Sequence, residues 1–179
     1  MLASSARVLT PILRICKGTD GKRPQKNGMK NTYTASSPED TERIGRALAL
    51  SFKLRGIHRA TIALRGELGV GKTAFTRGFA SAFELRGVRS PTYTVVNEYR
   101  GAEAVVYHFD MYRIEDEDEL YGIGFDDYLA AEAFCLIEWS ENVEECLPSD
   151  RYTVTIERVG PDRPDERRIT VEAEEELSL

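Results

Sequence analysis

The sequence Gly66-Glu67-Leu68-Gly69-Val70-Gly71-Lys72-Thr73 decides what this chain folds into. It fits the phosphate-binding pattern G-x-x-x-x-G-K-[ST], in which a glycine-rich loop surrounds phosphate oxygens with backbone N–H groups. The apolar, β-branched run 60–64 precedes it and predicts a buried strand. Apolar residues at helical spacing follow from Phe75 to Phe83 and predict a helix that closes near Gly87. Strand, loop and helix are the context that this pattern requires.

The chemistry of such a loop comes from its backbone and from two side chains. Glycines allow left-handed dihedral angles, so several N–H groups converge on one set of phosphate oxygens. The helix that follows adds unsatisfied N–H groups and the positive end of its dipole. Lys72 is expected to hold the β- and γ-phosphates, and the Thr73 hydroxyl is expected to bind Mg²⁺. We therefore predict a site for a nucleoside triphosphate, held by Glu67, Leu68, Gly69, Val70, Gly71, Lys72, Thr73 and Ala74.

Composition limits the possible functions. The chain has 179 residues, which predicts one domain with a single core. Its formal net charge of −6 argues against autonomous binding of nucleic acid, although a partner can supply a basic surface. No run approaches the roughly 18 apolar residues of a membrane span. Three cysteines without paired spacing favour a reduced, cytoplasmic protein, in which Cys135 is a small core side chain.

Residues 1–28 differ from the rest of the chain. They carry six basic side chains and one acidic side chain, Asp20. Three interpretations stand: a basic transit peptide, a disordered arm, or an over-extended reading frame with the true start at Met29. We leave this stretch out of the fold and assign residues 29–179 to a single P-loop domain.

The remaining segments predict alternating helices and strands. Ser37 as N-cap and Pro38 at the first helical position begin a helix that ends at Arg55-Gly56. The run 134–137 is continuously apolar, as in a strand buried on both faces, and the acidic segment 115–119 is expected to open a short helix. The other expected strands are 32–34 at an edge, 93–99 paired with 104–110, and 152–156 paired with 168–171. We predict a three-layer α/β P-loop NTPase fold, whose mixed sheet has parallel central strands and antiparallel edge strands.

Two carboxylates are candidates for the chemistry that a phosphate loop lacks. Hydrolysis needs a second acidic group near the metal and a means to place water. Glu138 follows the strand 134–137, at the strand end where open α/β sheets bind ligands, and is the candidate metal-binding acid. Asp110 ends the strand 104–110 and is the second candidate. An ordinary strand-end charge and a turn residue are the respective alternatives.

Two further residues have both a functional and a structural interpretation. Thr92 lies in Ser90-Pro91-Thr92, a loop where nucleotide switches place a hydroxyl that senses Mg²⁺ and the γ-phosphate. Its alternative is a simple turn. Trp139 is the only tryptophan and either stacks on the nucleotide or a partner, or packs in the core.

Four motifs with these gaps occur together in one known family. They are residues 66–73, Ser90-Pro91-Thr92-Tyr93, His108-Phe109-Asp110-Met111-Tyr112-Arg113 and Leu136-Ile137-Glu138-Trp139. In this combination the chain resembles the TsaE (YjeE) family, the P-loop ATPase of bacterial tRNA threonylcarbamoyladenosine biosynthesis. The resemblance covers about residues 36–158 and leaves residues 1–28 without a counterpart.

The resemblance implies an activity, cofactors and partners. It implies a Mg²⁺-dependent ATPase, slow alone, that acts with TsaB and TsaD in threonylcarbamoylation of adenosine 37 in tRNA. The resemblance implies that the protein contacts tRNA only indirectly, through its complex with TsaB and TsaD. By position, phosphate and metal roles fall to Lys72 and Thr73, the second acid is Glu138, Asp110 and Thr92 lie near the γ-phosphate, and Trp139 matters for activity.

The residues also leave other functions open. An arginine finger is worth about 10³–10⁵ in rate, and none is evident in the motifs, although Arg77, Arg89 and Arg113 are candidates. A protein without one hydrolyses ATP slowly until a partner completes the site. A metabolite phosphotransferase and an ATP-driven binding switch are the alternatives. No N-K-x-D element, on which guanine selectivity usually rests, is present.

Overall fold

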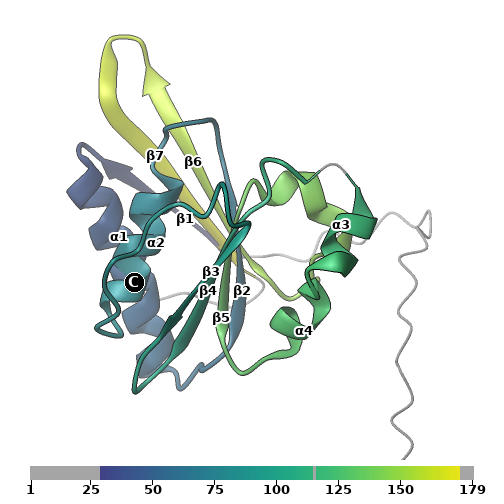
Figure 1. Cartoon of the computed structure of the whole chain (residues 1–179). Coiled ribbons are helices and arrows are strands. Elements are labelled where there is room, and N and C mark those ends of the chain that lie inside the picture. The colour runs from purple at the N-terminus through teal and green to yellow at the C-terminus, as the bar shows by residue number, and fades with distance from the viewer. Residues whose placement is uncertain (1–28, 115, 174–179) are drawn as a thin grey trace, which may run out of the picture.

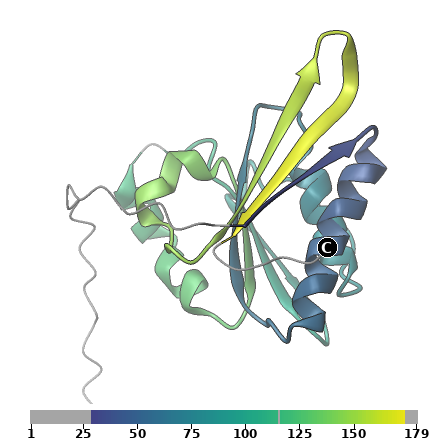
Figure 2. The same cartoon turned by 180° about the vertical axis from the view of Figure 1, so that it is seen from behind.

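The computed structural model describes residues 29–114 and 116–173, so the expectations about residues 1–28 lie outside it. Figure 1 and, from behind, Figure 2 show one twisted sheet with helices on both faces. The strands are β1 (Met29–Ala35), β2 (Ala60–Arg65), β3 (Val96–Arg100), β4 (Val105–Asp110), β5 (Phe134–Glu138), β6 (Tyr152–Gly160) and β7 (Arg163–Ala173). The helices are α1 (Pro38–Leu54), α2 (Lys72–Ser81), α3 (Glu117–Gly122), α4 (Phe125–Ala130) and the 3₁₀ segment η1 (Ser140–Cys146).

The sheet has the mixed topology that the sequence predicts. Its seven strands lie in the order β1-β7-β6-β2-β5-β4-β3. The four in the middle, β6, β2, β5 and β4, are parallel, and antiparallel pairs complete both edges. Helices α1 and α2 cover one face, while α3, α4 and η1 cover the other (Figure 1). The predicted α/β class with antiparallel edges is confirmed.

Strand β5 is the centre of both cores. All five of its residues are buried, as the continuous apolar run predicts. Phe134 and Leu136 face the core under α1 and α2, whereas Cys135 and Ile137 face the core under α3 and α4. Burial raises the pKa of the Cys135 thiol to about 12, which leaves it a protonated, unreactive core side chain.

Several expected boundaries are wrong, and two of them have a local reason. Helix α2 ends at Ser81 rather than near Gly87, because Glu84 takes a left-handed φ of 60° and Leu85 N–H turns back to the Ala80 carbonyl. The strand expected from residue 93 begins at Val96, because residues 94 and 95 donate their N–H groups to the Pro91 carbonyl. The terminal hairpin is longer than expected, and α4 and η1 have no counterpart among the predicted elements.

Two glycines bring α1 and α2 into direct backbone contact. A Cβ on Gly45 of α1 would lie 2.2 Å from the Phe75 carbonyl oxygen, and one on Gly78 of α2 would lie 1.9 Å from the Glu42 carbonyl oxygen. No side chain fits in either gap. The two contacts fix the position of α2, and therefore of the phosphate loop that leads into it, against α1.

We expect Gly78→Ala to lower the free energy of unfolding by about 1–3 kcal/mol, because the new methyl group forces the two helix backbones apart. Urea denaturation measures this change. The matched control is Gly122→Ala, since Gly122 has nothing within 4 Å of the added Cβ. Equal midpoints for Gly78→Ala and the unsubstituted protein would contradict the close contact between α1 and α2.

Candidate functional site

The phosphate loop joins β2 to α2 and depends on its glycines. Gly66, Gly69 and Gly71 have φ values of 135°, 74° and 116°, in the left-handed region that glycine tolerates. A Cβ on Gly66 would also lie 2.2 Å from the Ile156 carbonyl oxygen. The loop therefore has the curled backbone that the pattern predicts, and the N-terminus of α2, at Lys72, opens toward it.

The Lys72 ammonium lies over the loop and against Trp139. Its Nζ donates to the carbonyl oxygens of Gly66 (2.5 Å) and Glu67 (3.0 Å) and lies 3.8 Å from the centroid of the Trp139 ring. Burial lowers the Lys72 pKa, while the nearby carboxylates, Glu138 foremost, act in the opposite direction. A cation in this position is partly desolvated and available to an anion.

The register of the sheet brings the two candidate carboxylates together. Asp110 at the end of β4 is directly opposite Glu138 at the end of β5, and both are buried. The Thr73 hydroxyl donates to Glu138 Oε1 over 2.7 Å, which links the start of α2 to the end of β5. His108 Nε2 lies 2.7 Å from the same oxygen. Parallel strands that end together produce this cluster.

Asp110 is held by the loop that contains Thr92. Its Oδ2 accepts hydrogen bonds from Thr92 Oγ1 (2.5 Å) and Ser90 Oγ (3.2 Å). Its Oδ1 accepts from the Tyr112 backbone N–H (3.0 Å). Asp110 therefore does stabilise a turn, the structural alternative, while it also lies opposite Glu138. The two interpretations do not exclude each other.

Trp139 follows Glu138 in a strained backbone. Its φ is 56°, a conformation that costs an aromatic residue about 1–3 kcal/mol. The ring is half-buried between Lys72 and Tyr112, whose ring centroid is 4.9 Å away. The indole therefore lies beside Lys72 and also packs against the core under α3 and α4.

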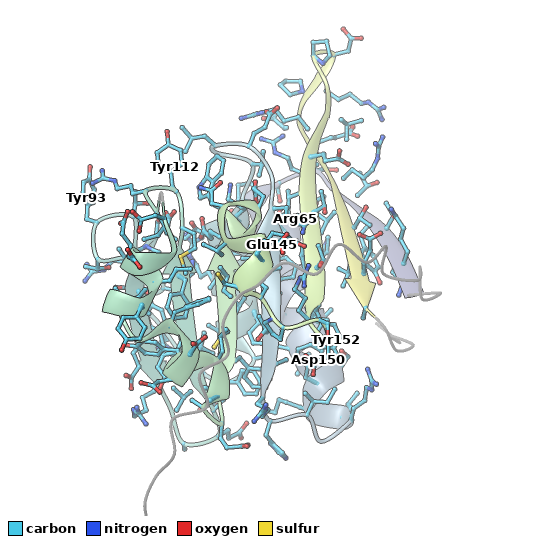
Figure 3. All side chains as sticks on the ribbon, turned by 90° about the vertical axis from the view of Figure 1, so that its right-hand side faces the viewer. Arg65, Tyr93, Tyr112, Glu145, Asp150 and Tyr152 are labelled. Atoms are coloured by element: carbon cyan, nitrogen blue, oxygen red, sulfur yellow. The ribbon has the colours of Figure 1, made fainter. Side chains whose placement is uncertain are left out.

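The three candidate arginines lie in different surroundings. Arg77 pairs with Glu42 of α1 (2.5 Å), and no side-chain contact of Arg89 is found within the described residues. Arg113 lies over the Tyr93 ring, 4.8 Å from its centroid. Tyr93 is 87% exposed and is seen with Tyr112 at one end of the molecule in Figure 3. Arg89, directly before Ser90 in the sequence, and Arg113, on the Tyr93 ring, both adjoin the loop that holds Asp110, whereas Arg77 is bound to α1.

Two arginines that the sequence analysis does not single out lie beside the phosphate loop. Arg158 of β6 and Arg167 of β7 are opposite each other in the hairpin register. Arg167 Nε donates to the Val70 carbonyl (3.2 Å), and Arg158 lies 3.7 Å from the Cβ position of Gly69. No sequence signal marks them, because only the strand pairing places this hairpin next to the loop.

The residues at the loop fit a nucleotide and Mg²⁺. The glycine backbone and Lys72 are suited to phosphate oxygens. The Thr73 hydroxyl and the Glu138 carboxylate are hard oxygen donors, which Mg²⁺ prefers together with substrate phosphates. Residues 29–114 and 116–173, this site included, contain no group of three or more His, Cys, Asp or Glu side chains that could hold a metal ion by themselves. No helix in these residues has the length and apolarity that crossing a membrane requires.

The fold and this loop define a protein of the P-loop nucleotide-binding class. A sequence model of the family "Threonylcarbamoyl adenosine biosynthesis protein TsaE" matches residues 35–169, and the chain belongs to this family. The expected family resemblance is thereby confirmed.

Individual relatives agree with this assignment. The tRNA threonylcarbamoyladenosine biosynthesis protein TsaE of Bacillus subtilis is 41% identical over 138 residues, which cover 76% of this chain and 82% of the relative. The Haemophilus influenzae protein of the same name is 42% identical over 117 residues, covering 64% and 74%. The crystal structure of Bacillus subtilis YdiB has a TM-score of 0.66 and 33% identity, and the similarity covers 83% of this chain and 88% of that one.

We expect nucleotide binding to change the fluorescence of Trp139, the only tryptophan, because a Lys72 ammonium drawn to phosphates leaves the indole ring. Titration with ATP and Mg²⁺ should give a saturable change that is lost in Lys72→Ala, whose affinity, measured by calorimetry, should fall about 10–100-fold. Trp139→Phe supplies the blank. Binding seen by calorimetry without any change in emission would show that Lys72 stays on the ring.

Proposed function

We propose that the chain is the Mg²⁺-dependent, ATP-hydrolysing subunit needed for threonylcarbamoylation of adenosine 37 in tRNA. It acts in the cytoplasm with TsaB and TsaD. The observation that carries the proposal is the hydrogen bond from Thr73 to Glu138, because it joins a phosphate loop to a second acid at the metal position. The names of the relatives place those proteins in tRNA threonylcarbamoyladenosine biosynthesis.

Each group in the site has a proposed part. The backbone N–H groups of residues 67–74 and the Lys72 ammonium hold the phosphates. Thr73 and Glu138 hold Mg²⁺, which when bound neutralises charge that develops on the phosphate oxygens. Asp110, fixed by Thr92, accepts a hydrogen bond from the attacking water and orients it. Trp139 shields Lys72 from solvent.

The proposed partner requirement is supported by the residues at the rim of the site. Tyr93 and Tyr112 expose large aromatic surfaces there, a composition typical of protein interfaces. Arg113 is directed onto Tyr93, so it can act as an arginine finger only if a partner moves it. Otherwise the partner supplies the arginine. The net charge of −6 is consistent with contact to tRNA through the other subunits.

An ATP-driven switch is the second candidate. It is favoured by the hydrogen bonds from Ser90 and Thr92 to Asp110, which tie the 90–95 loop to the end of β4. A γ-phosphate that competes for these hydroxyls would release or order that loop. In this alternative binding changes the affinity for the partner, and hydrolysis only ends the bound state.

We predict different defects for the two principal residues. Lys72→Ala should weaken ATP binding, since it removes the charge on the phosphates. Glu138→Ala should bind ATP without Mg²⁺ within about threefold of wild type and lose about 10²-fold or more in hydrolysis. Calorimetry and phosphate release measure the two properties. Glu145→Ala, seven residues on and exposed, is the control. Normal hydrolysis by Glu138→Ala would remove Glu138 from the proposed mechanism.

We expect phosphate release from ATP to be slow for the protein alone and at least tenfold faster with the cognate TsaB and TsaD. The physical reason is that a partner completes and dehydrates the γ-phosphate end of the site. The measurement is steady-state phosphate release at saturating Mg²⁺ and ATP. Partner binding that depends on ATP without stimulated release would favour the switch. Neither binding nor stimulation would overturn the proposed function.

A further inference from the structure

One buried titratable group has no part in the function proposed above. His108 of β4 is completely buried, and its Nε2 lies 2.7 Å from Glu138 Oε1. Its other ring nitrogen, Nδ1, is buried without a hydrogen-bond partner among the described residues. A core position that needed only volume would be filled by an apolar side chain without the cost of an unpaired polar atom.

The surroundings determine which nitrogen carries the proton. A carboxylate oxygen is an acceptor, so the short contact to Glu138 requires a proton on Nε2. A proton on Nδ1 would create a buried donor with nothing to accept from it, which is more costly than an unpaired acceptor. We therefore assign a proton to Nε2, so that His108 donates to Glu138.

This bond completes the coordination of one oxygen of Glu138. Oε1 accepts hydrogen bonds from Thr73 Oγ1 and from His108 Nε2, and both donor–acceptor distances are 2.7 Å. Within residues 29–114 and 116–173 no hydrogen bond to Oε2 is found. Two donors from different elements, α2 and β4, fix the plane of a carboxylate that one donor would leave free to rotate about its terminal bond.

Lys72 is the group that would otherwise attract this carboxylate. The charge of Glu138 acts on the Lys72 ammonium and counteracts the effect of burial on its pKa. If the Glu138 carboxylate rotated toward Lys72 Nζ, the two groups would form an ion pair. Glu138 would then be less available to the metal, and Lys72 less available to the phosphates. His108 opposes that movement because its Nε2 holds Oε1, and its place in β4, opposite Leu136 of β5, fixes where it holds it.

We propose that His108 is a positioning residue for the metal site. It holds Glu138 so that Oε1 accepts the hydrogen bond from the Thr73 hydroxyl and Oε2 faces the metal–nucleotide complex. Hydrogen bonds to a metal-binding carboxylate commonly change metal affinity or activity by about 10–100-fold. This inference rests on the proposed function, since it assumes that Glu138 meets Mg²⁺.

The test compares three substitutions in one strand. His108→Leu removes the donor and keeps an apolar side chain. His108→Gln keeps an N–H donor but cannot titrate. Phe109→Leu, the next residue, changes the opposite core, because Phe109 packs with Phe125 and Tyr128. Each protein is checked by urea denaturation and then titrated with ATP, with and without Mg²⁺, using Trp139 emission or calorimetry.

We expect His108→Leu to bind ATP without Mg²⁺ within about threefold of wild type. The gain in affinity on adding Mg²⁺ should be about 10–100-fold smaller than in wild type, and the Mg²⁺ concentration for half-maximal hydrolysis should rise. His108→Gln should recover most of both losses. Phe109→Leu should lower stability and leave the Mg²⁺ dependence unchanged.

Two results would overturn the inference. One is a folded His108→Leu protein with the wild-type Mg²⁺ dependence. The other is the same Mg²⁺ defect in Phe109→Leu, which would make His108 a merely structural residue. If His108→Leu does not fold, His108→Gln decides. A folded His108→Gln protein that loses the increase in ATP affinity on adding Mg²⁺ would overturn the donor role. Failure of wild type itself to bind Mg²⁺ with ATP would instead overturn the proposed function.

Discussion

The hydrogen bond from Thr73 to Glu138 is the interaction on which the site depends. It spans 2.7 Å between the first turn of α2 and the last residue of β5, so it exists only if the phosphate loop and the central strand are both correctly placed. The parallel pairing of β2 with β5 places Leu64 opposite Glu138. Because the loop begins two residues after Leu64, the sheet register itself brings the loop to the acid.

Helix packing supplies the remaining constraint on that bond. A loop attached to β2 can move unless the helix after it is fixed. Helix α2 is fixed by backbone contacts with α1 at Gly45 and Gly78. In addition, Phe79 of α2 packs against Phe52 of α1 and Phe134 of β5. The same apolar contacts that stabilise the domain therefore determine the geometry of the polar site.

The sequence predicts the elements of the site better than the contacts between them. The phosphate loop, the buried strand before Glu138 and the N-cap at Ser37 follow from local patterns, since the required residue types lie a few positions apart. Arg158 and Arg167 could not be found in this way, because they reach the loop only through the pairing of β6 and β7. The early end of α2 at Ser81 likewise depends on a non-glycine residue in a left-handed conformation.

The distribution of burial separates two tasks of the site. Asp110 and Glu138 are nearly inaccessible and bonded to neighbours, so their geometry is preorganised before any ligand arrives. Tyr93 and Tyr112 at the rim are exposed and lie on loops. A site whose polar groups are fixed but whose aromatic rim faces water is suited to bind a nucleotide firmly and to be closed by another protein. In the proposed function, the domain core supplies phosphate and metal binding, while the rim controls when water is excluded and turnover begins.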